Sequence, residues 1–267
     1  MATEFDSNAV AKIRDILDSE PDEGEALRRT LRVLAFHRST LIANTLIVNG
    51  GERVRRGPFA GLRLPRSAAE GCLAPKLLGA YESELHPVIE QIAYRGYRTI
   101  VNIGCAEGYY AVGLALRLPE ARVLAFDIEE SARTAARGLA DAHGVGDRVE
   151  IGGEFTTADF ASLDPGETFV FCDIEGAEID LLVPDKAPNL RKLDILVELH
   201  NVPEIGINRR MLEAFRPTHR LDLIETGARD IRDFPDLRTM EHLDQLLAFW
   251  EHRRGPTPWV LMMAKET

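Results

Sequence analysis

The stretch TIVNIGCAEGYYAVGLALRLPEARVLAFDIEE, residues 99–130, constrains the fold more than any other part of the sequence. It begins as an apolar strand, breaks at a loop that contains Gly104 and Gly108, and resumes as a helix. A second apolar strand then ends on an acid, Asp127. This order is typical of a parallel sheet, because two neighbouring parallel strands need a long crossover between them.

The alternation of strands and helices continues to the end of the chain. Predicted strands cover residues 99–103, 122–127, 148–151, 168–173, 193–200, 220–226 and 259–265. Their near-continuous apolar runs, separated by amphipathic helices, indicate a sheet that is covered by helices on both faces. The sequence therefore predicts a doubly wound, seven-stranded, Rossmann-like α/β sheet.

The first fifty residues follow a helical pattern. We expect one helix with Ser7 as its N-cap and a longer helix over residues 25–48, which a pair of glycines ends. Residues 1–52 are predicted to be a helical extension that either caps the active site or forms a dimer surface, and residues 53–267 the main domain. The polar segment 228–239 is predicted to be a surface loop or lid.

Charge and cysteine content narrow the classes of partner. The formal net charge of −11 argues against a nucleic-acid partner, because phosphates would be repelled. The three cysteines form no CxxC pair, so neither a zinc site nor a disulfide framework is predicted. The N-terminus has no signal pattern, and no apolar stretch is long enough to span a bilayer. We expect a soluble cytoplasmic protein without a membrane partner.

The glycines and the acid of the first unit have a spacing that suits a nucleoside. In a doubly wound sheet, ligands bind beyond the carboxyl ends of the strands, where Gly104 and Gly108 lie. Glycine there permits a tight turn and a close approach of the backbone to a ligand. Asp127 follows Gly108 by 19 residues, the usual distance for an acid that binds both ribose hydroxyls. The alternative is that both glycines only form turns and Asp127 caps a helix.

The loop does not fit a dinucleotide. A pyrophosphate site requires G-x-G-x-x-G, whereas this loop reads GCAEG. Glu107 would also place a negative charge at the helix N-terminus that should receive the phosphates. A cofactor with an adenosine but no phosphates fits better, and S-adenosylmethionine has an adenosine, an amino acid tail and a sulfonium cation.

Several motifs resemble one family. NIGCAEGYYAVGLA resembles the first motif of class I S-adenosylmethionine-dependent methyltransferases, AFDIEE resembles the second, and GDRVEIGGEF resembles the segment that lines the adenine. FCDIEGAEIDLL, GPFAGLRLP and PKLLGAYESEL resemble the FkbM-like branch, which contains many O-methyltransferases of small molecules. WVLMMAK resembles the family's final strand, which runs antiparallel between its neighbours. The resemblance covers residues 57–202 and makes 53–267 a methyltransferase domain.

The resemblance implies a set of cofactor contacts. Gly104, Ala106 and Gly108 would pass under the methionine portion, Asp127 would hold the ribose, and Ile128 and Phe155 would pack on the adenine. Glu154 would accept from the adenine amino group, Asp173 would border the cofactor, and Tyr81, with Tyr109 and Tyr110, is a candidate to face the sulfonium. Asn102 replaces the acid that the family commonly has before the first glycine. The methionine amino group would then need Glu82, Glu84 or Glu107.

Three titratable residues end neighbouring strands in the family topology. Asp173 ends one strand, while Glu198 and His200 end the next and share a face because they are two residues apart. One interpretation makes His200 a general base that Asp173 or Glu198 orients. The other makes all three ligands of a divalent metal, magnesium or manganese, that lowers the pKa of a substrate hydroxyl. In a third, Glu198 pairs with an arginine and His200 caps a loop.

These observations predict an S-adenosylmethionine-dependent methyltransferase that O-methylates a small polar metabolite. The alternative within the class is N-methylation of an amine or amino acid, which the same trio could serve. An NAD-dependent oxidoreductase is a rival from another class, although the missing third glycine counts against it. A non-catalytic protein that only retains the cofactor is a further alternative.

Overall fold

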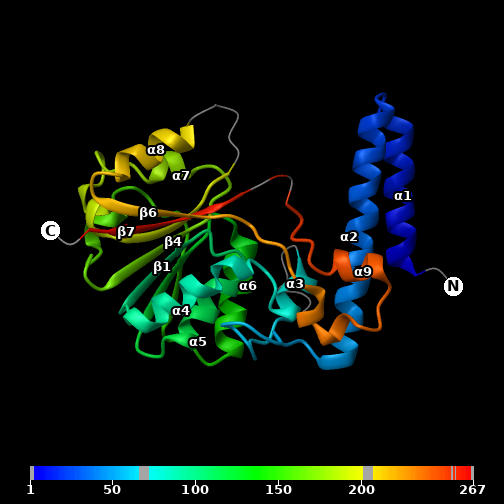
Figure 1. Cartoon of the computed structure of the whole chain (residues 1–267), viewed down its shortest axis with the longest axis horizontal. Coiled ribbons are helices and arrows are strands. Elements are labelled where there is room, and N and C mark those ends of the chain that lie inside the picture. The colour runs from blue at the N-terminus through cyan, green and yellow to red at the C-terminus, as the bar shows by residue number, and fades with distance from the viewer. Residues whose placement is uncertain (1–2, 66–71, 201–206, 254, 256, 266–267) are drawn as a thin grey trace.

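The computed structural model describes residues 3–65, 72–200, 207–253, 255 and 257–265. A helix-covered sheet forms one end of the molecule, and a long helical hairpin projects from the other end (Figure 1). The seven strands are ordered β3-β2-β1-β4-β5-β7-β6. Their bounds are β1 (Thr99–Ile103), β2 (Arg122–Phe126), β3 (Val149–Gly152), β4 (Thr168–Cys172), β5 (Asp194–Glu198), β6 (His219–Ile224) and β7 (Trp259–Ala264).

The predicted fold class is confirmed, including the direction of the last strand. The pairs β1–β2, β1–β4, β2–β3 and β4–β5 are parallel. β7 runs antiparallel to both β5 and β6, between which it lies. Each predicted strand agrees with the observed one to within two residues at either end, because buried apolar runs mark strands clearly.

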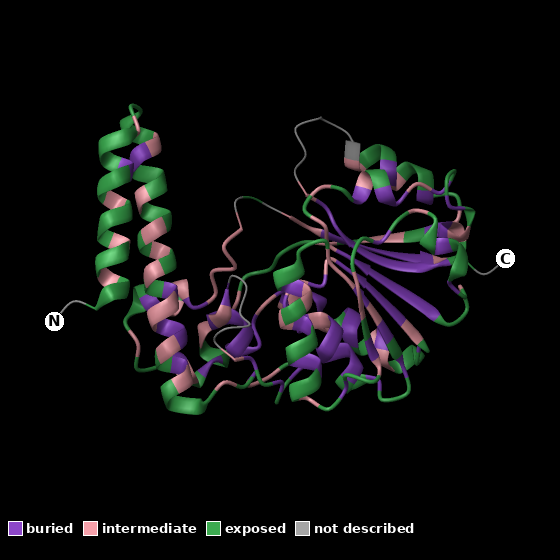
Figure 2. Ribbon diagram, turned by 180° about the vertical axis from the view of Figure 1, so that it is seen from behind, coloured by how far each residue is buried: buried purple, intermediate pink, exposed green. Residues whose placement is uncertain are grey.

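Two layers of helices cover the sheet (Figure 1). α4 (His86–Arg95), α5 (Tyr109–Arg117) and α6 (Glu130–Ala142) cover one face, while α7 (Glu178–Leu181) and α8 (Ile207–Phe215) cover the other. Successive strand residues supply the two cores: Ile100 packs in the first, and Val101 packs in the second. The strands are therefore buried along most of their length (Figure 2).

The two N-terminal helices form as predicted, but the first has a different N-cap. α1 (Glu4–Ser19) is capped by Thr3, not by Ser7, because Thr3 and Asp6 form a reciprocal capping box. α2 (Glu23–Gly50) is capped by Asp22 and ends at Gly51, as the glycine pair indicates. The first part of α2 pairs with α1, whereas its second part packs against α3 (Leu73–Leu78) and α9 (His242–Leu247).

The segment 228–239 lies mainly at the surface, as its polar composition predicts. It contains two short 3-10 helices, η5 (Ile231–Asp233) and η6 (Pro235–Leu237). Phe234 and Leu237 are buried in a core that includes Ile42 of α2 and Leu77 of α3. Two apolar side chains therefore anchor the segment, and its action as a lid stays a prediction. No helix in the described ranges is long and apolar enough to cross a membrane.

Candidate active site

A pocket of about 560 Å³ opens at the carboxyl ends of β1, β2 and β4. β1 pairs with β2 on one side and with β4 on the other, so the winding direction of the sheet reverses here. The lining contains six of the residues predicted to bind the cofactor, namely Gly104, Asp127, Ile128, Glu154, Phe155 and Asp173. The topology thus brings together the ends of strands that lie far apart in the sequence.

The loop after β1 has a backbone that only small residues can form. Gly104 has φ +79°, and a Cβ there would lie 1.7 Å from the carbonyl oxygen of Asp173. Gly108 has φ +92° and forms the N-cap of α5, with Ala136 of α6 directly beside it. Ala106 is also left-handed, with φ +46°. The loop can therefore pass close under a ligand at the mouth of the pocket.

Asp127 fixes that loop from the end of β2. Its Oδ2 accepts a 2.9 Å hydrogen bond from the backbone N–H of Ala106, and its Oδ1 accepts one of 2.9 Å from Glu129. The carboxylate therefore lies at the rim of the pocket with both oxygens oriented by backbone donors. Next to it, the side chain of Ile128 is 74% exposed, which leaves an apolar surface open to a planar ring.

Four residues predicted to contact the cofactor are not in this lining, namely Ala106 and Gly108 of the loop after β1, Tyr81 and Glu84. Glu84 is buried in an ion pair with Arg229, whose Nη2 is 2.6 Å from Glu84 Oε2, and it does not line the pocket. Tyr81 also lies outside the lining, and its ring already faces the ammonium of Lys76, 5.0 Å from the ring centre. Between them, Glu82 has a left-handed backbone, with φ +45°.

The other acids considered for the methionine amino group are also engaged. Glu107 is buried and forms an ion pair with Lys76, so its charge is balanced at the start of α5. Glu82 accepts hydrogen bonds from the hydroxyl of Tyr110 and from Arg253. Burial, together with the charge of Glu198, raises the pKa of Glu82 to about 8. Of the three acids, Glu82 is the one whose charge acts on Asp173.

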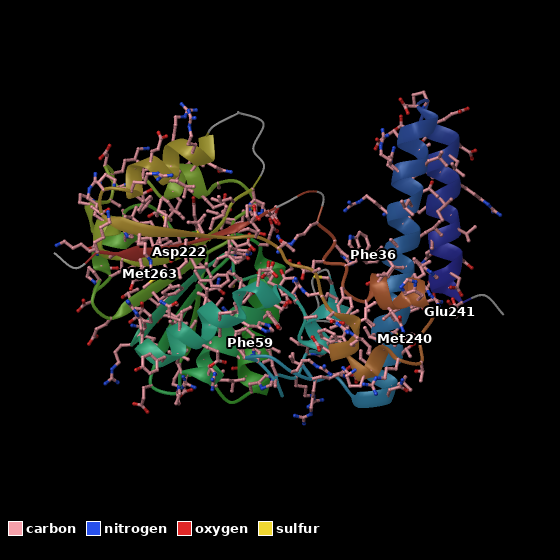
Figure 3. All side chains as sticks on the ribbon, viewed as in Figure 1. Phe36, Phe59, Asp222, Met240, Glu241 and Met263 are labelled. Carbon is pink, nitrogen blue, oxygen red and sulfur yellow. The ribbon has the colours of Figure 1, made fainter. Side chains whose placement is uncertain are left out.

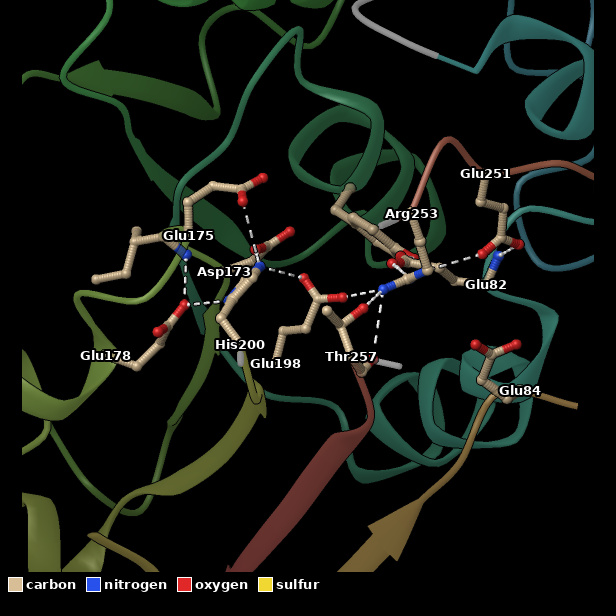
Figure 4. Close-up of polar contacts among 12 residues, drawn as sticks. Glu82, Glu84, Asp173, Glu175, Glu178, Glu198, His200, Glu251, Arg253 and Thr257 are labelled. Carbon is tan, nitrogen blue, oxygen red and sulfur yellow. Dashed lines mark hydrogen bonds and ion pairs between the residues drawn. The ribbon is translucent and has the colours of Figure 1, made fainter. Parts of the chain in front are cut away.

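The predicted trio does converge (Figure 4). His200 Nε2 lies 3.3 Å from Glu198 Oε2 and 3.6 Å from Asp173 Oδ1. These three residues lie beyond the carboxyl ends of β4 and β5, which are hydrogen-bonded neighbours. Asp173 is the member that lines the pocket. Among the residues that the structure describes, its buried Oδ1 has no hydrogen-bond partner.

The residue that orients His200 was not part of the predicted trio. Glu178, at the start of α7, is buried, and its Oε1 lies 2.9 Å from His200 Nδ1. The same oxygen accepts from the backbone N–H of Ile174, also at 2.9 Å. Glu178 and His200 are 22 residues apart, and only the fold brings them together. The ring is thereby held with Nε2 facing Glu198 and Asp173.

Arg253 is the second missed residue. It precedes β7 and donates to Glu198 Oε1, to Glu82 Oε1 and to Glu251 Oε2 (Figure 4). The alternative in which Glu198 pairs with an arginine is therefore correct for one of its oxygens, while the other faces His200. No local pattern could reveal this contact, because Arg253 and Glu198 are 55 residues apart.

The environment shifts the proton affinities of the trio. Burial and the charge of Glu198 raise the pKa of Asp173 well above its usual value. Burial lowers the pKa of His200, but the hydrogen bond with Glu178 and the charge of Glu198 outweigh it and raise the pKa. A carboxyl group whose pKa is raised toward neutrality is a better general base than an ordinary one.

A divalent cation could be held by a slightly different set from the one predicted. Ligand atoms of Asp173, Glu175 and His200 all lie within 4.8 Å of one another. Glu198, the third ligand of the prediction, is instead directed to Arg253 and His200. Two carboxylates and an imidazole can bind magnesium or manganese, although they suit them less well than an all-oxygen set.

Comparisons with known proteins agree with this fold. No model of a known protein family matches the chain. A release factor glutamine methyltransferase from Chlorobaculum tepidum is 38% identical over 107 residues, which cover 38% of this chain and 33% of that protein. The chain thus matches about a third of the length of this curated relative.

Two solved structures share the architecture. One is the O-methyltransferase TomG from Streptomyces achromogenes in complex with SAM, with 19% identity, a TM-score of 0.51, and coverage of 77% of this chain and 92% of that one. The other is cofactor-bound Rv0187 from MTB, with 17% identity, a TM-score of 0.50 and full coverage of both chains. The chain therefore has the Rossmann-like fold of class I S-adenosylmethionine-dependent methyltransferases.

Proposed function

We propose that this protein is an S-adenosylmethionine-dependent methyltransferase that O-methylates a small polar molecule. The observation that carries the proposal is the position of Asp173, which lies between the pocket rimmed by Asp127 and the pair formed by His200 and Glu198. One pocket thus joins a nucleoside-binding rim to a cluster that can accept a proton. The net charge of −11 supports a small-molecule acceptor over a nucleic acid.

The residues of the pocket fit the parts of the cofactor. Asp127 would accept from the ribose hydroxyls, while Ile128 and Phe155 provide apolar contacts for the adenine. Glu154, in the same lining, would accept from the adenine amino group. S-adenosylmethionine, when bound, supplies an activated methyl group on a sulfonium cation. Asp173 and Glu175 in the same lining suit such a cation, because opposite charges attract.

The chain's own residues would remove the acceptor's proton. Asp173 meets the acceptor first, since it is the member of the trio in the pocket lining. During transfer of the methyl group to the acceptor oxygen, the Asp173 carboxylate would take up the hydroxyl proton. His200, fixed by Glu178, and Glu198, fixed by Arg253, lie beside that carboxylate, and the charge of Glu198 raises its pKa.

A second candidate is methylation of nitrogen. The sequence relative from Chlorobaculum tepidum is named for glutamine, which supports an amide or amine acceptor. An amine with a free lone pair needs less help from a base than a hydroxyl does. The assignment to the FkbM-like branch and the metal-bound interpretation of the trio both stay predictions.

The test uses labelled S-adenosylmethionine and a panel of hydroxyl, carboxyl and amine acceptors. With the accepted substrate, Asp173→Asn and His200→Ala should lower kcat by roughly 10²–10⁴ while S-adenosylhomocysteine affinity stays within about threefold. A matched control is Asp180→Asn, an exposed acid in the same lining that lies outside the trio. Full turnover in both trio variants would refute the role of base and favour the nitrogen acceptor.

A chelator separates the two versions of the trio. Activity that survives EDTA supports the version in which Asp173 accepts the proton of the acceptor without a metal. Activity that is lost with EDTA and restored by magnesium or manganese assigns Asp173, Glu175 and His200 as ligands. Glu175→Gln would then abolish the restoration, whereas a metal-free mechanism predicts only a small effect of this exposed side chain.

A further inference from the structure

A second cavity, of about 340 Å³, lies between the N-terminal hairpin and the segment that precedes β7. α1 and α2 supply most of its lining, and Trp250 and His252 supply the rest. It shares no lining residue with the pocket at the carboxyl ends of the strands. Its volume is near the lower end of the range for small-molecule sites, so a ligand of one or two rings would fit.

Aromatic side chains form two groups in this lining. Phe5 of α1 stacks on His37 of α2, with ring centres 4.6 Å apart and 13° between the ring planes. His252 contacts Trp250 at 4.3 Å and Phe36 at 5.3 Å between ring centres. Phe36 lies on α2 beside the segment that precedes β7 (Figure 3). Phe5 and Phe36 remain 36% and 47% exposed, so the cavity offers open aromatic surface to a planar ring.

The lining also carries positive charge that no acid balances. It contains Lys12 and Arg32, and none of its described residues is a carboxylate. Lys12 has no hydrogen-bond or ion-pair partner among the residues that the structure describes. Arg32 donates from Nη2 to the carbonyl oxygen of His252, at 3.1 Å. That acceptor is neutral, and a guanidinium has five N–H donors, so both the charge and most of the donors of Arg32 stay available.

The groups around the two cations leave this charge in place. Burial and the charges of Arg32 and Lys76 lower the pKa of His252. Asp6 contacts the lining through His37, whose Nε2 is 2.9 Å from Asp6 Oδ1. The other oxygen of Asp6 accepts from the backbone N–H and the hydroxyl of Thr3, and Asp6 itself is outside the lining. The cavity therefore suits an anion, although the chain as a whole has a formal net charge of −11.

From these observations we propose that the cavity is a second ligand site, which binds a small aromatic anion such as an aryl carboxylate. The ring would lie against Phe5, Phe36 and Trp250, and the carboxylate would accept from Arg32 and Lys12. The guanidinium carbon of Arg32 is 5.8 Å from the centre of the Trp250 ring, so the aromatic contact and the charge contact are adjacent. The inference is independent of the proposed methyltransferase function, since the two pockets share no residue.

The test titrates the full chain with 2-naphthoate and follows the indole N–H signals by two-dimensional NMR. The chain has two tryptophans, Trp250 in the lining and Trp259, which is fully buried on β7. The Trp250 signal, assigned with Trp250→Phe, should shift and saturate with a Kd of about 1 mM or below, while the Trp259 signal stays in place. The neutral 2-naphthamide and the non-aromatic cyclohexanecarboxylate should each bind roughly tenfold more weakly.

Variants test the two cations. Lys12→Gln combined with Arg32→Gln should weaken the binding of 2-naphthoate by about tenfold or more. The matched control is Arg28→Gln, one turn earlier on α2, which is outside the lining and paired with Glu25; it should bind within about twofold of the wild type. If the double variant lost helical circular dichroism, Lys12→Gln alone would decide, and it should weaken binding by about threefold or more.

Four results would overturn the proposal. The first is a Trp250 signal that 2-naphthoate does not move at about 10 mM, well above the expected Kd. The second is equal binding of 2-naphthamide, which would mean that the cavity does not select charge. The third is equal shifts of both tryptophan signals, which would mean that the anion acts on the whole protein. The fourth is wild-type affinity in the folded cation variants, which would place the anion elsewhere.

Discussion

Replacement of Asp127 should separate its two functions, one in the loop and one in the cofactor site. Its carboxylate accepts from two backbone N–H groups, those of Ala106 and Glu129, each at 2.9 Å. Asp127→Ala removes both hydrogen bonds, and the two backbone N–H groups must then bond to water. Hydrogen bonds to a charged group contribute about 1.5–3 kcal/mol each when buried, and less at a rim such as this one. We therefore expect unfolding stability to fall by about 1–3 kcal/mol.

The same substitution should also weaken the binding of the cofactor, beyond what the loss of folding stability explains. Loss of the ribose contact should cost about 1.5–3 kcal/mol, which corresponds to a roughly 10- to 150-fold weaker Kd for S-adenosylhomocysteine. Asp127→Asn keeps one acceptor oxygen and should fall between the wild type and Asp127→Ala. Isothermal titration calorimetry gives the affinities, and urea denaturation gives the stabilities.

Asp180→Ala serves as the control for Asp127, because Asp180 is an exposed acid in the same pocket lining. It should keep S-adenosylhomocysteine affinity within about threefold, below 1 kcal/mol. The reasoning would be refuted if Asp127→Ala bound as tightly as the wild type, or if Asp180→Ala weakened binding to the same extent as Asp127→Ala.

Two further predictions follow from the loop and from Glu82. Gly104→Ala should abolish S-adenosylhomocysteine binding in calorimetry, because its Cβ would overlap the carbonyl oxygen of Asp173, whereas Gly153→Ala in the same lining, with open space around it, should bind normally. Equal binding by both would contradict the close approach. Glu82 has a folded pKa of about 8, above its unfolded value, so it should destabilise the fold by a few kcal/mol as pH rises from about 4.5 to 8. Urea denaturation across this range should show a smaller decline in stability for Glu82→Gln than for the wild type; parallel curves would count against the assignment.

The pH dependence of turnover gives one more prediction. Asp173 must be deprotonated to accept a proton, so kcat should rise with pH through its raised pKa. Burial is the main cause of that shift and the charge of Glu198 comes next, so Glu198→Gln should move the rising limb to lower pH. A limb that stayed in place in Glu198→Gln would argue that another group titrates.

The strands could be predicted because buried apolar runs are local signals. The convergence of Asp173 with Glu198 and His200 could be predicted because the family that the motifs resemble places their strands side by side. The roles of Glu178 and Arg253 depend on contacts 22 and 55 residues away, for which no short pattern exists.

One wrong prediction has a physical reason of the same kind. Ser7 was a reasonable N-cap, but Thr3 forms a capping box with Asp6 one turn earlier. Tyr81 and Glu84 contact Lys76 and Arg229 and do not line the pocket, and their contacts with the cofactor stay predictions. The segment 228–239 lies mainly at the surface, as predicted, and Phe234 and Leu237 anchor it against α2 and α3.

The most direct test of the central claim is calorimetry of the wild-type protein with S-adenosylhomocysteine and, separately, with NAD⁺. The pocket has an acid, Asp127, in its lining and a loop without the third glycine of a pyrophosphate site, and Glu107 occupies the start of α5. We predict a saturable heat of binding with S-adenosylhomocysteine and none with NAD⁺. Binding of NAD⁺ in the absence of any S-adenosylhomocysteine binding would contradict the account.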